Sequence, residues 1–267
     1  MPDQTAANPQ PVPPDRQAAQ SPPAALSTQV LDRLTAVTGV TESPTPWARL
    51  TGDAFPGQVG SVRYFTGSGP VASVVHISLV VPTVGLDSHM VFAFGAADGP
   101  LPHFTLDAVH AGEGYAFHLD LVQRADLASH PAYTDTVYGP LTTAHGSAAE
   151  IPGLTPAAIG PRQRALMSPW MLVHRADEAA LRAVGPLADS YLEHWLTLVG
   201  AFPSGAADEV KDTDLADRDR RLRAALFSRE IDPVWAQVDR LLGPATTDAL
   251  RGLLITGSPD GTAGDAS

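Results

Sequence analysis

The 267-residue sequence contains no cysteine. Disulfide bonds, thiolate metal sites and a cysteine nucleophile are therefore excluded, and nothing indicates an exported protein cross-linked by disulfides. Long apolar runs are also lacking, since no stretch approaches the roughly 18 apolar residues that a membrane span requires. The chain does not begin with the basic residues and apolar run of a secretory signal. We therefore expect a cytoplasmic protein without a membrane partner.

Basic residues are scarce: 17 lysines and arginines stand against 29 aspartates and glutamates, giving a net charge of −12. A nucleic-acid-binding protein normally carries a basic surface that contacts phosphates, so we expect no nucleic-acid partner. The chain has no Gly-x-Ser-x-Gly element, and "FTGSGP" lacks the lysine and the following helix of a phosphate-binding loop. Hydrolase and nucleotide-dependent functions therefore lack support.

Metal motifs are missing as well. No pair among the nine histidines has the spacing of a motif such as His-Glu-x-x-His, and cysteine ligands are absent. A single histidine is more often a hydrogen-bonded core or surface residue than a metal ligand. We therefore expect no metal site.

What the sequence does contain is one body that can fold between two tails of low complexity. Residues 1–26 are rich in proline, alanine and glutamine, and residues 257–267 have a similar polar composition. Such segments bury too little apolar surface to fold, so we expect both to be disordered. Hydrophobic residues make up 44% of the chain, enough for a sizeable core. We expect a single domain over residues 27–256, with Ser27 as the N-cap of its first helix.

The order of strand-like and helix-like segments indicates the α+β class. Five segments bounded by glycine, proline or aspartate alternate as strands do: residues 60–67, 71–82, 89–96, 103–111 and 115–123. They follow one another too closely for helical crossovers, so an antiparallel meander is expected. Helical periodicity dominates the C-terminal third, with segments at residues 176–199, 212–227 and 234–254, and residues 168–175 can form one more strand. We expect an antiparallel sheet covered by helices.

An acid in the middle of one strand is the most unusual feature of this pattern. Asp107 lies within "HFTLDAVHA", on the same strand face as His103, Thr105 and Val109. If the strand is central, burial raises the pKa of the carboxyl group and suits it to hold and deliver a proton. The more ordinary alternative from this strand alone is that Asp107 lies on a solvated face or bonds a nearby backbone group.

Further polar residues lie where they can join Asp107. His89 opens the preceding strand, and pairing of adjacent antiparallel strands can bring its imidazole near the carboxylate. The helical segment "DLADRDRRLRAALF" contains two i,i+4 pairs, Asp217 with Arg221 and Asp219 with Arg223. An exposed salt-bridged helix face is the ordinary interpretation of this pattern. Alternatively, Arg220 and Arg223, three residues apart, can clamp a ligand carboxylate.

Several motifs, in order, resemble those of red chlorophyll catabolite reductase, which belongs with the ferredoxin-dependent bilin reductases. The resemblance spans about residues 71–243. It rests on His103-Phe104 with Asp107, Leu119-Asp120-Leu121, Arg124 with Asp126-Leu127, Pro131 with Tyr133 and Tyr138, Ser168-Pro169, and the helical segment at 218–243. It is the shared order of these elements, more than any one of them, that identifies the family.

The resemblance implies a fold and an activity. The fold would be a three-layer α/β/α sandwich with a central antiparallel sheet. A linear tetrapyrrole, either a bilin or a molecule like a chlorophyll catabolite, would lie between the sheet and the C-terminal helices. It would be reduced with electrons from ferredoxin and protons from side chains, with no metal or organic cofactor bound. Asp107 would donate a proton, Asp219 would face it from the helix, and His89 would relay protons or bond the substrate.

The resemblance also assigns substrate contacts and leaves alternatives. Arg220 or Arg223 would pair with a propionate, while His103 and Ser168 would lie at the substrate. Some bilin reductases carry another acid near the position of Ser78, which this chain lacks, and a net charge of −12 disfavours docking of an acidic ferredoxin. A same-fold enzyme that carries out non-reductive acid–base chemistry on another conjugated ligand, and a non-catalytic tetrapyrrole-binding protein, therefore remain as alternatives.

Overall fold

The computed structural model describes residues 20–52 and 54–260, and within them nine strands form one sheet in the order β1-β3-β4-β5-β6-β7-β9-β8, with β2 also pairing with β3. The strands are β1 (Thr41–Ser43), β2 (Leu50–Gly52), β3 (Phe55–Thr66), β4 (Val71–Val81), β5 (Leu86–Gly95), β6 (His103–Ala111), β7 (Gly114–Val122), β8 (Thr155–Pro156) and β9 (Leu172–Ala176). All of these pairings are antiparallel. The expected antiparallel meander is confirmed in β3 to β7, which are neighbours both along the chain and in the sheet.

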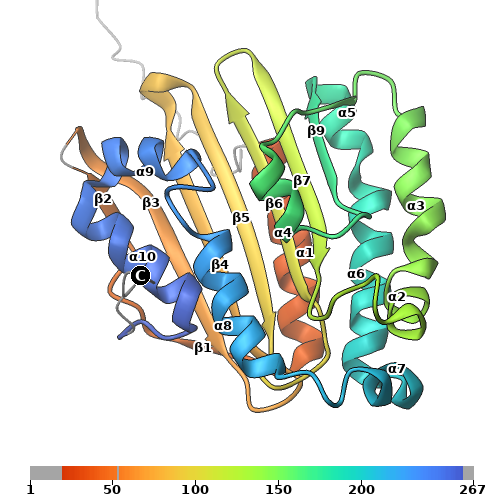
Figure 1. Ribbon diagram of the computed structural model, residues 1–267. Helices are drawn as coiled ribbons and strands as arrows, with labels where there is room; N and C mark the ends of the chain where they lie inside the picture. The colour runs from red at the N-terminus through yellow and green to blue at the C-terminus, as the bar shows by residue number, and fades with distance from the viewer. Residues whose placement is uncertain (1–19, 53, 261–267) are drawn as a thin grey trace, which may run out of the picture.

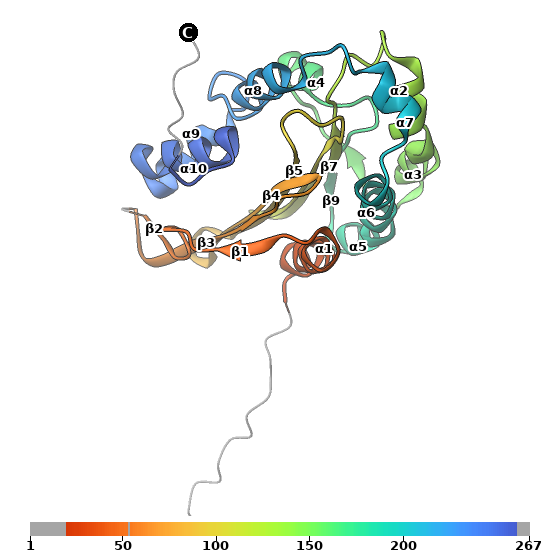
Figure 2. The same cartoon turned by 90° about the horizontal axis from the view of Figure 1, so that it is seen from below.

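Helices cover both faces of this sheet (Figure 1). The helices are α1 (Pro22–Thr38), α2 (Pro131–Val137), α3 (Thr142–Ser147), α4 (Pro161–Leu166), α5 (Glu178–Ala183), α6 (Gly185–Gly200), α7 (Ser204–Glu209), α8 (Leu215–Leu226), α9 (Val234–Leu242) and α10 (Pro244–Thr256), with short 3-10 turns η1 (Pro82–Val84), η2 (Gly139–Leu141) and η3 (Ala148–Glu150). Figure 2 shows α8 to α10 on one side of the strands and α1 on the other. The α+β class and the helix–sheet–helix layering are thus confirmed.

Two apolar cores, one on each face of the sheet, hold these layers together. On the first face, side chains such as Val91 and Phe104 pack against α1 and α6. On the second face, Ile77 and Phe94 pack against the C-terminal helices, where Phe227 and Trp235 form edge-to-face contacts. Because successive side chains of a strand point to opposite faces, near-continuous apolar runs such as that of β4 supply both cores.

The expected ends of the folded region were partly wrong. Helix α1 begins at Pro22, because Ser21 caps it through its hydroxyl oxygen and proline suits the first turn. Ser27 is therefore a buried residue inside the helix, where its hydroxyl donates to the backbone oxygen of His89. At the other end, the oxygen of Gly257 accepts a hydrogen bond from the hydroxyl of Tyr64, so the chain is placed beyond residue 256. The rest of the two predicted tails, residues 1–19 and 261–267, lies outside the described residues.

Membrane insertion finds no support in the helices. In the part of the chain that the structure describes, none of them combines the length and the apolar character that a crossing requires.

Candidate functional site

The second face of the sheet changes character between β5 and β6. The apolar core on this face takes its strand residues from β2 to β5. On β6 and β7 the same face instead presents a polar stripe, which we define as His103, Thr105, Asp107, His118 and Asp120. The opposite face of these two strands is apolar and packs on the first core. A row of polar side chains on a covered sheet face is costly unless the groups are bonded or serve a ligand.

Asp107 and His118 are the central pair of this stripe. They lie directly opposite each other in the β6–β7 register, which places their Cβ atoms about 5 Å apart. Oδ1 of Asp107 and Nε2 of His118 are both enclosed, and neither has a hydrogen-bond partner in the described part of the chain. Burial raises the pKa of Asp107 to about 7 and lowers that of His118 to about 4. Near neutral pH the pair is therefore an acid that can hold a proton beside an uncharged imidazole.

Asp232 is a second acid near this pair, and sequence reasoning missed it. It lies in the turn between α8 and α9, where its Oδ1 accepts a hydrogen bond from the backbone N–H of Val234 at 3.0 Å. After burial, its negative charge is the further cause that raises the pKa of Asp107. Burial also raises the pKa of Asp232 itself. An aspartate before a proline is typical of turns, so the sequence held no signal of this role.

Asp219 lies on the same side of the sheet as Asp107 but faces a different residue. Its Oδ1 is 2.6 Å from Nε2 of His103 and 3.2 Å from Nη1 of Arg124, and its Oδ2 is 3.8 Å from Nη1 of Arg223. Since His103 is four residues from Asp107 along β6, this contact is about 13 Å away from Asp107 along the strand. The expectation that Asp219 faces Asp107 was wrong, because the arginines and His103 draw its carboxylate to the end of the strand.

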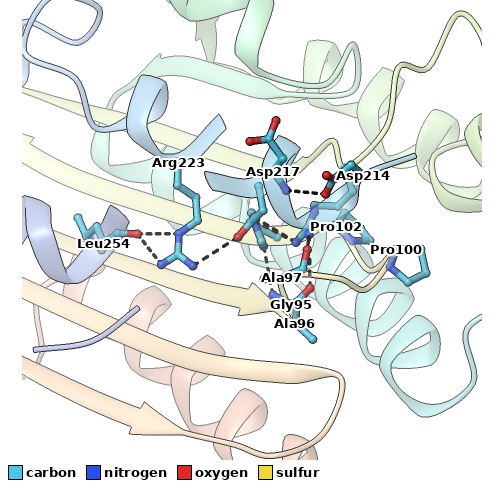
Figure 3. A network of polar contacts seen from close by, with 12 residues as sticks. Gly95, Ala96, Ala97, Pro100, Pro102, Asp214, Asp217, Arg223 and Leu254 are labelled. Carbon is cyan, nitrogen blue, oxygen red and sulfur yellow. Dashed lines mark hydrogen bonds and ion pairs between the residues drawn. The ribbon is translucent and has the colours of Figure 1, made fainter. Parts of the chain in front are cut away.

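The side chains of His103 and Arg223 form hydrogen bonds to other residues of the protein. Nδ1 of His103 accepts from the backbone N–H of Gly95 at 3.1 Å, which leaves Nε2 to donate to Asp219. Burial lowers the pKa of His103 to about 4, so the ring is neutral near pH 7. Figure 3 shows Arg223 directed at the backbone oxygen of Leu254, to which its Nε and Nη2 donate at 2.8 and 2.5 Å. Its guanidinium also lies 3.8 Å from the ring centre of Phe94.

Arg220 and Arg223 do not form the expected clamp. Arg220 is exposed and donates to Asp217 at 2.5 Å, whereas the side chain of Arg223 is buried under α10. Residues three apart are neighbours on a helix surface, but here Arg223 is buried whereas Arg220 stays exposed. The interpretation of an exposed salt-bridged face holds for Asp217 and Arg221 and was wrong for Asp219 and Arg223, which are buried.

Ser168 reaches the polar stripe through Asp120. Its hydroxyl and its backbone N–H both donate to the Asp120 carboxylate, at 2.5 and 2.9 Å. Asp120 is fully buried, and burial raises its pKa to about 7 in spite of these two bonds. His118 and Asp120 were not among the expected site residues. The alternation of "YAFHLDLV", together with the tight turn before it, could have placed both of them beside the Asp107 strand.

His89 is the residue that the structure does not bring to this site. It pairs with Ala108, so its imidazole lies on the first face of the sheet, opposite to Asp107. There Nε2 lies 2.8 Å from Oδ1 of Asp87, and the ring stacks on that of His76 with centroids 5.8 Å apart. Met90 occupies the position across from Asp107. The expected proximity of His89 to Asp107 was wrong, because a shift of one residue in register reverses the face.

Among the described residues, no group of three or more His, Asp or Glu side chains is placed to hold a metal ion.

The raised pKa of Asp107 predicts a pH dependence of stability. An acid whose pKa is about 7 when folded, against 3.8 ordinarily, binds more protons in the folded state, so its contribution to stability falls as the pH rises from about 4 to about 7. Asp107→Asn lacks this contribution. We expect the variant to gain free energy of unfolding relative to the wild type across this interval, with a constant difference above it, as measured by urea unfolding.

Asp217→Asn is the matched control for this measurement. The pKa of Asp217 is lowered by hydrogen bonds to Arg220 and by the charge of Arg221. This variant should therefore lose stability relative to the wild type only as the pH rises to about 3.8, which is the opposite sign, and it should show no further change from there to pH 7. A difference between Asp107→Asn and the wild type that does not vary with pH would contradict a raised pKa at Asp107.

Comparisons with known proteins bear on the fold of this site. No protein-family model matches the sequence, and no curated protein matches it significantly. Solved structures do match, in 35 chains. One is the crystal structure of phytochromobilin synthase from tomato in complex with biliverdin, with a TM-score of 0.66 and 15% sequence identity over 91% of this chain and 85% of that chain. The chain therefore has the fold of a ferredoxin-dependent bilin reductase, as its sequence motifs predict.

Proposed function

We propose that this protein reduces a linear tetrapyrrole bound between the polar stripe and the C-terminal helices, with Asp107 as a proton donor. One observation carries the proposal: on a covered sheet face, Oδ1 of Asp107 is enclosed without a hydrogen-bond partner among the described residues, and burial there raises the pKa of the group. The fold is shared with an enzyme that has been crystallised with biliverdin. A carboxyl group that titrates near neutral pH can both hold and release a proton there.

The reaction needs two electrons and two protons for each double bond that becomes saturated. Asp107 transfers its proton to the tetrapyrrole as an electron arrives, and its carboxylate is then protonated again from solvent. A one-electron donor such as ferredoxin supplies the electrons in two steps. The reaction involves no hydride transfer, because electrons and protons arrive separately, and each proton comes from a side chain or from water.

A carboxylate-bearing ligand also needs a cationic partner at the rim of the site. Arg175 is exposed and pairs with Ala116, so it lies on the same face of the sheet as His118. It can meet a propionate group in a bidentate contact without leaving the surface. We propose Arg175 for this role, because Arg223 already donates to Leu254 and Arg220 donates to Asp217.

A second candidate is acid–base chemistry on a conjugated ligand without electron transfer. The charge of the protein favours it, because ferredoxin is acidic and this chain has a net charge of −12. Helix α8 carries a dense cluster of arginines, yet Arg220 and Arg221 both pair with Asp217 at 2.5 and 2.7 Å. Such pairing weakens a surface for an acidic electron donor.

The experiment follows the visible absorption of biliverdin as the purified protein is added. We expect a saturable spectral change, followed by loss of the long-wavelength band when reduced ferredoxin is supplied without oxygen. The Arg175→Gln variant should bind biliverdin more weakly, whereas Arg164→Gln, an exposed change on α4, should not. Binding without reduction would favour acid–base chemistry or a carrier. The absence of any spectral change would refute a tetrapyrrole ligand of the biliverdin type.

A further inference from the structure

His118 is a half-buried titratable residue to which the proposed function assigns no role. It extends from the middle of β7, and Phe117 and Leu119 on either side of it pack into the first core. These two anchors fix the direction of the imidazole toward the second face. Its Nε2 is enclosed without a partner in the described chain, as is Oδ1 of Asp107 on the neighbouring strand. Leaving a buried nitrogen and a buried oxygen unpaired in adjacent positions costs stability, which a structural role would not explain.

The surroundings of the pair contain few charges. Met90 on β5 and Val173 on β9 flank it in the same row across the sheet. Asp232 approaches Asp107 from the turn after α8, and Asp120 is two residues along β7 from His118, bonded to Ser168. Burial is the cause that keeps the ring of His118 neutral, and Asp232 adds to the burial that keeps Asp107 protonated. Among the described residues, Oδ1 of Asp107 and Nε2 of His118 have no other partner that would prevent exchange of a proton between them.

We propose that His118 is a positioning residue that returns a proton to Asp107 after each transfer to the ligand. This inference rests on the proposed role of Asp107 as proton donor. In the first step the O–H bond of Asp107 breaks and its proton passes to the ligand. The N–H bond at one ring nitrogen of His118 then breaks and that proton returns to Asp107, while the other ring nitrogen takes a proton from solvent. The ring stays neutral overall, and one solvent proton enters for each proton delivered.

The first test uses the full-length protein without ligand, so it does not depend on the substrate. Ring 15N signals of the histidines are followed by NMR as a function of pH, and His118→Gln identifies the signals of His118. We expect these signals to move as Asp107 titrates near pH 7. In Asp107→Asn this movement should vanish. Signals of His118 that are the same in the wild type and in Asp107→Asn across this pH range would overturn the proposal.

The second test separates the first proton transfer from its repetition. His118→Ala is mixed with biliverdin and reduced ferredoxin, under single-turnover and multiple-turnover conditions. We expect the first protonation to keep nearly its wild-type rate, because Asp107 already carries its proton, and repeated turnover to slow by about 100-fold. Added imidazole should restore turnover, whereas pyrazole, a ring of the same shape and much weaker basicity, should not. His110→Ala, on the same strand as Asp107 but on the opposite face, should behave like the wild type.

The two tests distinguish failure of the inference from failure of the proposed function. If wild-type protein does not reduce biliverdin, the proposed function fails, and the NMR titration still decides whether the ring of His118 is coupled to the titration of Asp107. If the wild type turns over and His118→Ala slows both phases equally, or is restored equally by imidazole and pyrazole, His118 only fills space. Should His118→Ala fail to fold, His118→Gln replaces it in the kinetic experiment, with the same expected loss of repeated turnover.

Discussion

Replacement of Asp107 by asparagine is expected to slow reduction of a bound linear tetrapyrrole by at least about 100-fold, the ordinary contribution of a positioned proton donor. Asparagine has nearly the same shape and bonds similar partners, but it cannot release a proton at neutral pH. The rate is measured from the absorption of biliverdin after mixing the enzyme–biliverdin complex with reduced ferredoxin under anaerobic conditions. Affinity for biliverdin should change little, since the variant removes a proton and keeps the side-chain volume.

The matched control is Asp98→Asn, an exposed acid in the turn that leads from β5 to β6. It should retain the wild-type rate. A pH profile adds a second criterion, because the wild-type rate should fall as the pH rises past about 7, where Asp107 loses its proton. An Asp107→Asn protein that binds biliverdin and reduces it at the wild-type rate would show that the proton comes from elsewhere.

Replacement of Asp219 by alanine is expected to lower the free energy of unfolding by about 3–5 kcal/mol, as when one member of a buried ion pair is removed. Asp219 is 4% exposed, and its carboxylate lies 3.2 Å from Arg124 and 3.8 Å from Arg223. Without it, both buried guanidinium groups lose their counter-charge and His103 loses the acceptor of its Nε2–H. Urea unfolding at pH 7 measures the loss.

Asp217→Ala, two residues earlier on α8, is the matched control. Asp217 pairs with Arg220 and Arg221 at the surface, where solvent screens the charges, so its loss should be much smaller than that of Asp219. Asp219→Asn keeps the shape and one acceptor, and it should fall between the wild type and Asp219→Ala. Equal stability of Asp217→Ala and Asp219→Ala would argue against a buried ion-pair network that ties α8 to the end of β6.

The ion-pair network of Asp219 with Arg124 and Arg223 also explains why Asp219 lies away from Asp107. Arg124 donates to the backbone oxygens of Ala96 and Ala97, and Arg223 donates to that of Leu254. Asp219 between them thus connects the β5–β6 turn, the end of β7 and the last helix. Its physical role is to fix these segments against one another, which holds α8 at the His103 end of the polar stripe.

The sequence by itself determined the sheet and marked Asp107 as the unusual acid within it. Alternation of apolar residues, with glycine or proline between the segments, is a local property, so β3 to β7 and their antiparallel order follow from it. The same period of two placed His103, Thr105 and Asp107 on one face. Burial raises the pKa of an acid only where its strand face is covered, so the strand and the family resemblance together selected Asp107, and the covered face is given by the tertiary structure.

Only the tertiary structure decided which side chains meet. The sheet face on which His89 lies depends on the register of β5 against β6, and a shift of one residue would reverse it. Hydrophobic patterning does not indicate this register, because β5 is apolar on both faces. Asp219 meets His103, and Asp232 approaches Asp107, because packing of Phe227 and Trp235 sets where α8 ends and α9 begins. These contacts join segments more than 100 residues apart, and such pairings depend on the packing of the whole chain, which no local pattern encodes.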